Sequence, residues 1–79
     1  MDDIIHDQQQ QAFRLSYHGA EARLEYYRSG DSIDFRRTFV PPELRGQGLA
    51  ERLVRHGLDW SKQQGLDISA SCWYVQKFL

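Results

Sequence analysis

The sequence has little cysteine and no excess of basic charge, and each shortage excludes a class of protein. Among its 79 residues there is one cysteine, Cys72, which rules out an internal disulfide and fits the reducing cytoplasm. Ten lysines and arginines stand against eleven aspartates and glutamates, so the formal net charge is −1. This balance argues against a dedicated nucleic-acid-binding domain, which normally carries a basic excess.

Long hydrophobic runs are also missing. No apolar stretch approaches the roughly 18 residues of a membrane helix, so no membrane partner is expected. The two acidic residues that follow Met1 are wrong for a secretory signal. The length fits one domain, and we predict a soluble cytoplasmic protein.

The first part of the chain has no regular apolar pattern. Residues 1–11 are acidic and then glutamine-rich, and we interpret them as a flexible N-terminal arm before a single domain over residues 12–79. From Ala12 onward three segments alternate apolar and polar residues, with turns at His18–Gly19 and Ser29–Asp31 between them. They predict an antiparallel meander of three strands.

The third of these strands has one irregular feature. Ile33, Phe35 and Phe39 are expected to share one face, with Arg37 interrupting the pattern. Pro41 follows, and because proline donates no hydrogen bond, strand pairing should end at Val40.

A helical pattern follows the strands. Leu49, Leu53, Gly57 and Trp60 recur at helical spacing, and Gly65 is placed to end the helix. Residues 66–71 alternate again and predict a fourth strand, parallel to the third because a helix lies between them. Residues 72–79 fit a short closing helix. The predicted fold is α+β, with a mixed, mostly antiparallel sheet of about four strands, one main helix and a short C-terminal helix.

The most informative stretch is the glycine-rich turn that opens the main helix. Such a helix start presents unpaired N–H groups and the positive end of the helix dipole, an arrangement that binds phosphate. A P-loop is excluded because no Lys-Ser or Lys-Thr follows the glycines. A dinucleotide-binding fingerprint is excluded because Glu51 stands where its third glycine belongs.

A third phosphate-binding pattern, Arg/Gln-x-x-Gly-x-Gly/Ala, is satisfied by Arg45, Gly48 and Ala50. With this turn, the chain resembles the GNAT acetyltransferase superfamily, and more closely its very small single-domain N-acetyltransferases. The resemblance runs from about Phe13 to Leu79. Besides the turn, it rests on Thr38, Val40-Pro41, Leu44 and the Cys-Trp-Tyr-Val segment at residues 72–75.

The resemblance implies a truncated GNAT-like fold that binds acetyl-CoA as acyl donor. The diphosphate of CoA would lie at the turn, and the pantetheine arm would pair with polar groups left free at the end of the third strand. Gly46 and Gly48 let the backbone approach a bulky diphosphate, and Arg45 adds charge-assisted hydrogen bonds. Alternatively, the glycines only shape the connection and Arg45 is solvated. The residues expected to bind acetyl-CoA are Phe39, Val40, Arg45, Gly46, Gln47, Gly48, Leu49 and Ala50.

Cys72 and Tyr74 are the candidate catalytic residues. The predicted strand pairing places Cys72 beside Val40, near the expected thioester. In direct transfer an amine attacks the thioester, and Cys72 or Tyr74 protonates the departing thiolate. In a covalent route the Cys72 thiolate takes the acetyl group first. Both routes remain open, as does a packing role for either residue. Related sequences often have histidine where Arg37 stands, so no general base is identified.

The predicted function is acetyl transfer to an amine of unknown identity on a protein, peptide or small molecule. The alternative is a CoA-binding module or regulator without efficient chemistry, because little chain remains to wall off an acceptor pocket. We expect a monomer or a weak homodimer. His6, His18 and His56 show no metal-ligand spacing, so no metal site is expected.

Overall fold

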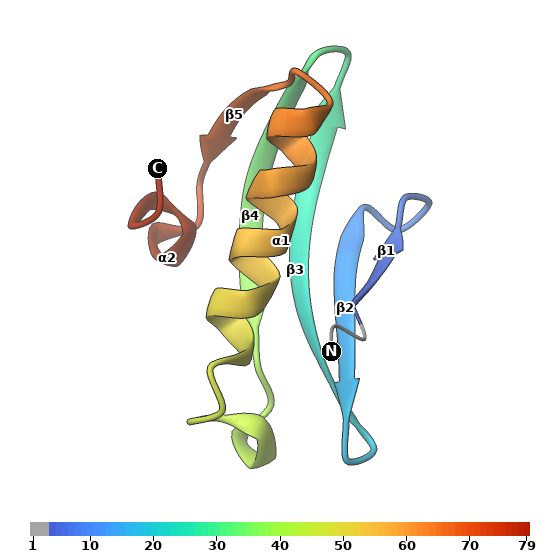
Figure 1. The fold of residues 1–79 in the computed structure, drawn as a ribbon, viewed down its shortest axis with the longest axis vertical. Coiled ribbons are helices and arrows are strands. Elements are labelled where there is room, and N and C mark those ends of the chain that lie inside the picture. The colour runs from blue at the N-terminus through green and yellow to red at the C-terminus, as the bar shows by residue number, and fades with distance from the viewer. Residues whose placement is uncertain (1–3) are drawn as a thin grey trace.

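The computed structural model describes residues 4–79, which form one five-stranded sheet with a main helix on one face (Figure 1). The strands lie in chain order, β1 to β5. The first four are antiparallel, and β5 runs parallel to β4. The elements are β1 (Ile4–Asp7), β2 (Ala12–Tyr17), β3 (Ala20–Ser29), β4 (Ser32–Phe39), the 3-10 turn η1 (Pro42–Leu44), α1 (Leu49–Gln63), β5 (Asp67–Ala70) and α2 (Trp73–Gln76).

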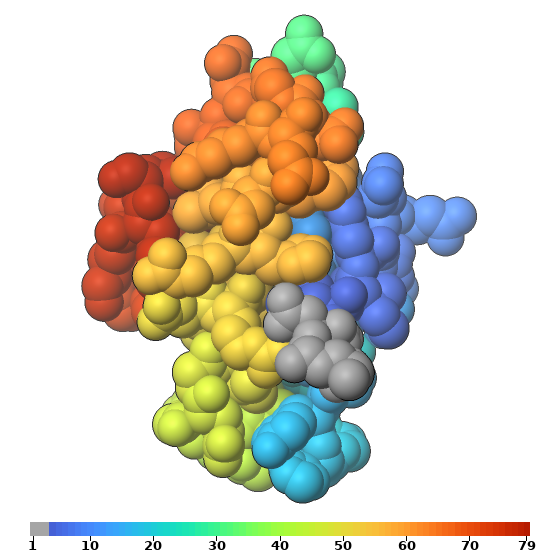
Figure 2. Space-filling model, in the orientation of Figure 1, coloured from blue at the N-terminus to red at the C-terminus, as the bar shows by residue number. Residues whose placement is uncertain are grey.

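This architecture confirms the predicted α+β class, the mixed sheet, the main helix and the short C-terminal helix, with one strand more than expected. Figure 1 shows α1 lying along β3 and β4, with β1 and β2 on one side of it and β5 and α2 on the other. In the space-filling view α2 forms a lobe beside α1 (Figure 2). None of the helices in the described part of the chain is long and apolar enough to cross a membrane.

Strand β1 comes from a segment that the sequence was expected to leave as a flexible arm. Residues 1–3 of that arm lie outside the described residues, but Ile4–Asp7 pair with β2 along their whole length. The prediction for residues 4–7 was therefore wrong.

His6 explains why β1 is held on the sheet. Its ring stacks on Phe13 with 4.0 Å between ring centroids, and its Nε2 lies 2.7 Å from the hydroxyl oxygen of Tyr26. The edge of Trp60, on α1, completes this cluster at 4.4 Å. His6 packs here as a flat aromatic ring. A search for alternating apolar residues treats histidine as polar and therefore misses this strand.

Helix α1 packs on the sheet along the predicted stripe. Leu53 and Gly57 are buried on it, and Gly57 makes the closest approach. A Cβ at position 57 would lie 2.9 Å from Leu24 Cδ2 and 3.1 Å from Phe35 Cε1. Any larger side chain would push the helix away from these strands, so the glycine sets the spacing between helix and sheet.

The helix ends where the sequence predicts. Gly65 adopts a φ of 71°, in the left-handed region that glycine tolerates. Its N–H donates to the Lys62 carbonyl and the N–H of Leu66 donates to the Ser61 carbonyl, both at 3.1 Å. These two bonds form a Schellman cap, which turns the chain directly into β5.

A β-bulge interrupts the pairing of β3 with β4. Tyr26 lies opposite Phe35, whereas its neighbour Glu25 lies opposite Arg37. Arg36 is therefore the extra residue of the bulge. An extra residue reverses the alternation of side chains beyond it.

The reversal overturns one prediction. Phe39 was expected on the face that Ile33 and Phe35 share, but it lies on the opposite face and is 37% exposed. Thr38 faces the helix side instead, directly opposite the buried Leu24. The strand itself ends at Phe39, one residue earlier than predicted.

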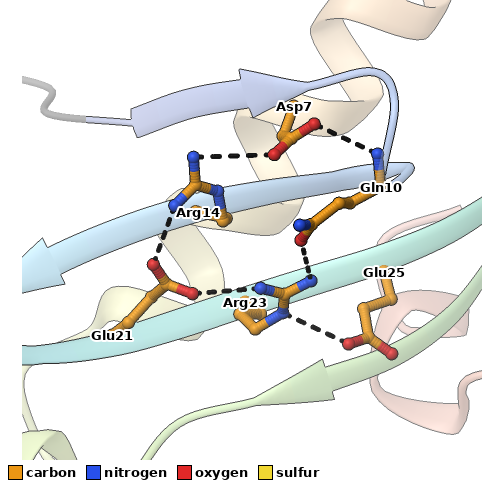
Figure 3. A network of polar contacts seen from close by, with 6 residues as sticks. All are labelled: Asp7, Gln10, Arg14, Glu21, Arg23 and Glu25. Atoms are coloured by element: carbon orange, nitrogen blue, oxygen red, sulfur yellow. Dashed lines mark hydrogen bonds and ion pairs between the residues drawn. The ribbon is translucent and has the colours of Figure 1, made fainter.

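Within residues 4–79 no helix covers the other face of the sheet, and a network of charged side chains lies on it (Figure 3). Arg14 contacts Asp7 at 3.6 Å and Glu21 at 3.1 Å, and Arg23 contacts Glu21 at 3.1 Å and Glu25 at 3.2 Å. Each pair of this kind stabilises the fold by about 1 kcal/mol at most. The network sets two arginines against three carboxylates and keeps this part of the surface polar.

Protonation of His6 should weaken the fold. Burial, followed by the nearby charge of His56, lowers the pKa of His6 below its ordinary value of 6.5, while Asp7 opposes the shift. The unfolded chain therefore binds the proton more readily, and stability should fall as the pH drops below about 6.5. We expect the urea midpoint to decrease between pH 7.5 and pH 5.5. His6→Phe keeps the stacking and should flatten this slope; an unchanged slope would contradict the assignment.

Candidate functional site

The turn between β4 and α1 owes its shape to two glycines. Gly46 and Gly48 have φ values of 82° and 73°, in the region where other residues are strained. A Cβ at either position would meet no atom within 4 Å. The backbone conformation therefore requires both glycines, and the space beside them is open.

The start of α1 directs N–H groups toward this open space. The N–H of Arg52 makes the first bond of the helix, to the Gly48 carbonyl at 3.2 Å. The N–H groups of Leu49, Ala50 and Glu51 precede that bond, where a helix has no internal acceptors for them. Together with the positive end of the helix dipole, they form an arrangement suited to an anion.

Two adjoining hollows lie at this end of the molecule. We call them the turn hollow, of about 220 Å³, and the cysteine hollow, of about 250 Å³. Four residues line both: Val40, Arg45, Ala50 and Tyr74. The turn hollow is completed by Leu44, Gly46, Gly48, Leu49 and Glu51. The cysteine hollow is completed by Thr38, Phe39, Cys72 and Trp73.

The structure brings together all the predicted site residues except Gln47, which lines neither hollow. Four lining residues were not assigned to the site from the sequence: Thr38, Leu44, Glu51 and Trp73. Thr38 could not be placed without knowledge of the bulge. Glu51 follows directly after the turn, and its position in the first turn of the helix was a usable signal.

Arg45 is held by its own chain. Its Nε donates a hydrogen bond to the Val40 carbonyl at 3.1 Å. The expectation that the polar groups of Val40 stay free is therefore wrong for this carbonyl. The bond fixes the guanidinium where the two hollows meet, and its terminal nitrogens retain further donors for a ligand.

Cys72 lies where the chain leaves β5. Its N–H donates to the Phe35 carbonyl at 3.0 Å, which extends the alignment of β5 with β4. Its Sγ lies 3.6 Å from the hydroxyl oxygen of Thr38. The thiol thus contacts Thr38 rather than standing beside Val40, as the sequence predicted, although Val40 lines the same hollow.

The surroundings of Cys72 favour its thiolate. Partial burial raises the pKa of the thiol, but the N–H of Val75, the Thr38 hydroxyl and the N–H of Tyr74 together lower it by more, so the pKa lies below the ordinary value of 9.0. The two N–H groups at the start of α2 point toward the sulfur without forming a capping hydrogen bond. A lowered pKa increases the thiolate fraction near neutral pH.

Tyr74 has the opposite tendency. Burial and the nearby carboxylate of Glu51 raise the pKa of its phenol above 10.0, and Arg55 offsets part of the shift. The phenol therefore stays protonated at neutral pH. Among the described residues, no group of three or more His, Cys, Asp or Glu side chains is arranged to hold a metal.

The fold and the turn together define a class of protein. The chain belongs to the family described as GCN5-related N-acetyl-transferase, whose model matches residues 12–79. It is similar to Protein NATD1 of Mus musculus, with 32% identity over 79 residues, covering 96% of this chain and 72% of the relative. Protein NATD1 of Homo sapiens is 31% identical, covering 96% of this chain and 70% of the relative. The Xenopus tropicalis protein of that name is 30% identical, covering 96% and 72%.

Loss of the Thr38 hydroxyl should make the Cys72 thiol less acidic. Thr38→Val removes one of the groups that stabilise the thiolate, so the pKa should rise. The inflection of the pH–rate profile for alkylation by iodoacetamide should move upward, and the rate at pH 7 should fall by roughly threefold or more. Ser71→Ala is the matched control, because the Ser71 hydroxyl bonds Asp34 at 2.7 Å. Equal profiles for both variants would contradict the role of Thr38.

Proposed function

We propose that the chain binds acetyl-CoA and transfers its acetyl group to an amine. One observation carries this proposal: the turn with its N–H donors and the Cys72 thiol lie in adjoining hollows that share four lining residues. An acyl donor with an anionic end and a thioester end matches this arrangement. Family membership supports the choice of acetyl-CoA.

In this proposal the turn holds the diphosphate. The N–H groups from Gly46 to Ala50 donate to it, and the terminal nitrogens of Arg45 add charge. The carboxylate of Glu51 also lines the turn hollow, but Arg55 Nε pairs with it at 2.8 Å and offsets its repulsion of an anion.

The pantetheine arm runs along the free edge of β4. Pairing with β5 reaches only as far as Phe35 opposite Ala70, so the backbone of Phe39 and Val40 lies beyond the partner strand. With the Val40 carbonyl bonded to Arg45, the contacts on this edge differ from those expected from the sequence.

Bound acetyl-CoA supplies a thioester, whose carbon accepts the amine as the carbon–sulfur bond breaks. The departing thiolate needs a proton. Cys72 is the better proton donor, because its pKa lies below that of an ordinary thiol. Tyr74 has a raised pKa, so proton transfer from its phenol to the departing thiolate would be energetically unfavourable. Thr38 then stabilises the Cys72 thiolate until solvent reprotonates it. The same thiolate is also the nucleophile of the covalent alternative.

A negatively charged side chain at the turn should weaken CoA binding. Gly48→Glu places bulk and negative charge where the diphosphate would lie, and we expect at least about a tenfold loss of affinity in an amide NMR titration with CoA. Gly30→Glu is the matched control, because Gly30 also has a positive φ, 57°, with no atom near its missing Cβ. The control should have a similar cost in stability and normal binding. Unchanged spectra of the wild type at millimolar CoA would refute the proposal.

Removal of the thiol should slow acetyl transfer without preventing CoA binding. With Cys72→Ala we expect CoA release in the presence of amines to fall by about a hundredfold or more, the usual range for loss of a proton donor. The measurement is free thiol released from acetyl-CoA, with and without a panel of amines. An acetyl group on Cys72 in the intact mass would select the covalent route. Full turnover by Cys72→Ala would exclude both roles, and binding without any turnover would leave a CoA-binding module.

A further inference from the structure

Cations border the cysteine hollow, whereas none of the described residues that line it is acidic. Arg45 lines the hollow directly. The guanidinium carbon of Arg37 lies 5.3 Å from the ring centroid of Phe39, and Lys77 Nζ lies 5.3 Å from that of Trp73. Both aromatic residues line the cysteine hollow and are exposed to solvent; 71% of the surface of Trp73 is accessible. The mouth of this hollow is therefore positive, although the chain as a whole has a net charge of −1.

Two of these cations have no carboxylate partner within residues 4–79: Arg37 and Lys77 make no ion pair there. The neighbouring Arg36 is different, because it pairs with Asp34 at 3.3 Å. Glu25 lies opposite Arg37 across the strands, but Arg23 engages it at 3.2 Å. The charges of Arg37 and Lys77 are thus available to a bound molecule.

The position of Arg37 separates it from the proposed diphosphate site. Arg37 and Phe39 project from the face of the sheet that α1 does not cover, because the bulge reverses the alternation in β4. The turn, by contrast, leads into α1 itself. A molecule that contacts Arg37 would reach the cysteine hollow from the helix-free side, as a second substrate would.

A positive mouth also bears on how the acceptor amine loses its proton. Like charges lower the pKa of an ammonium group. An α-amine, with a pKa of about 7.7–8.0, is then largely unprotonated near neutral pH, whereas a lysine amine at about 10.4 is not. Since no general base is identified near Cys72, an α-amine is the acceptor that needs one least.

We infer that the acceptor is the N-terminal α-amine of a peptide whose first residues are acidic, and that Arg37 and Lys77 determine this specificity by binding the acidic side chains. The inference rests on the proposed transfer reaction. Its chemistry is the same amide formation: the amine nitrogen bonds the acetyl carbon, the carbon–sulfur bond breaks, and the thiolate and the amine exchange a proton through Cys72 and solvent.

The test uses two C-terminally amidated peptides that differ only in having glutamate or glutamine at the first two positions. Binding to the CoA-saturated protein is followed through the amide of Phe39 and the indole N–H of Trp73. We expect the glutamate peptide to bind about tenfold more tightly. The double variant Arg37→Gln, Lys77→Gln should reduce this preference to below about threefold. Arg36→Gln, which removes one positive charge beside Arg37, should preserve it.

Equal binding of the two peptides would overturn the inference, as would an equal loss of preference in Arg36→Gln. Turnover separates this failure from failure of the proposed function. Selective binding of the glutamate peptide with no acetylation of any amine would refute transfer and leave the acceptor surface standing. Faster acetylation of a lysine side chain in an N-terminally blocked acidic peptide would overturn the choice of an α-amine. Preference for free glutamate over free glutamine, without preference between the peptides, would overturn the choice of a peptide.

Discussion

The bulge at Arg36 is the constraint on which the arrangement of the site depends. With regular alternation beyond Phe35, Thr38 would face away from α1 and its hydroxyl would not reach Cys72. The extra residue turns Thr38 toward the thiol and Phe39 toward the opposite face. The end of β4 therefore presents one side chain of the site on each face of the sheet. In the proposed reaction, the acyl donor occupies the side of α1 and the acceptor occupies the other.

Much of this fold was predictable because its signals are local. Alternation in β2 to β5, helical spacing in α1 and the cap at Gly65 each depend on residues close in sequence. The glycine turn is local too, so most of the candidate site was named from the sequence. The bulge and β1 depend instead on pairing between distant residues: the first on the register of β4 against β3, the second on His6 stacking on Phe13. A single sequence does not display such contacts.

The distribution of charge shows the same limit. The sequence as a whole is nearly neutral, yet two regions of the surface differ in charge. Over β1 to β3, Arg14 and Arg23 pair with carboxylates, which offset their positive charge. At the end of β4 and beside α2, Arg37 and Lys77 lie against aromatic rings instead. The local charge, rather than the total, is what a ligand approaching Cys72 would meet.

The two tryptophans lie in different surroundings, so their fluorescence should respond to different events. Trp60 is partly buried beside His6, while Trp73 is largely exposed at the cysteine hollow. Iodide in solution would quench the fluorescence of Trp73 well before that of Trp60. A molecule bound in the cysteine hollow would change the fluorescence of Trp73, whereas detachment of β1 would change that of Trp60. The two events would thus give separate fluorescence signals in the unlabelled, unsubstituted protein.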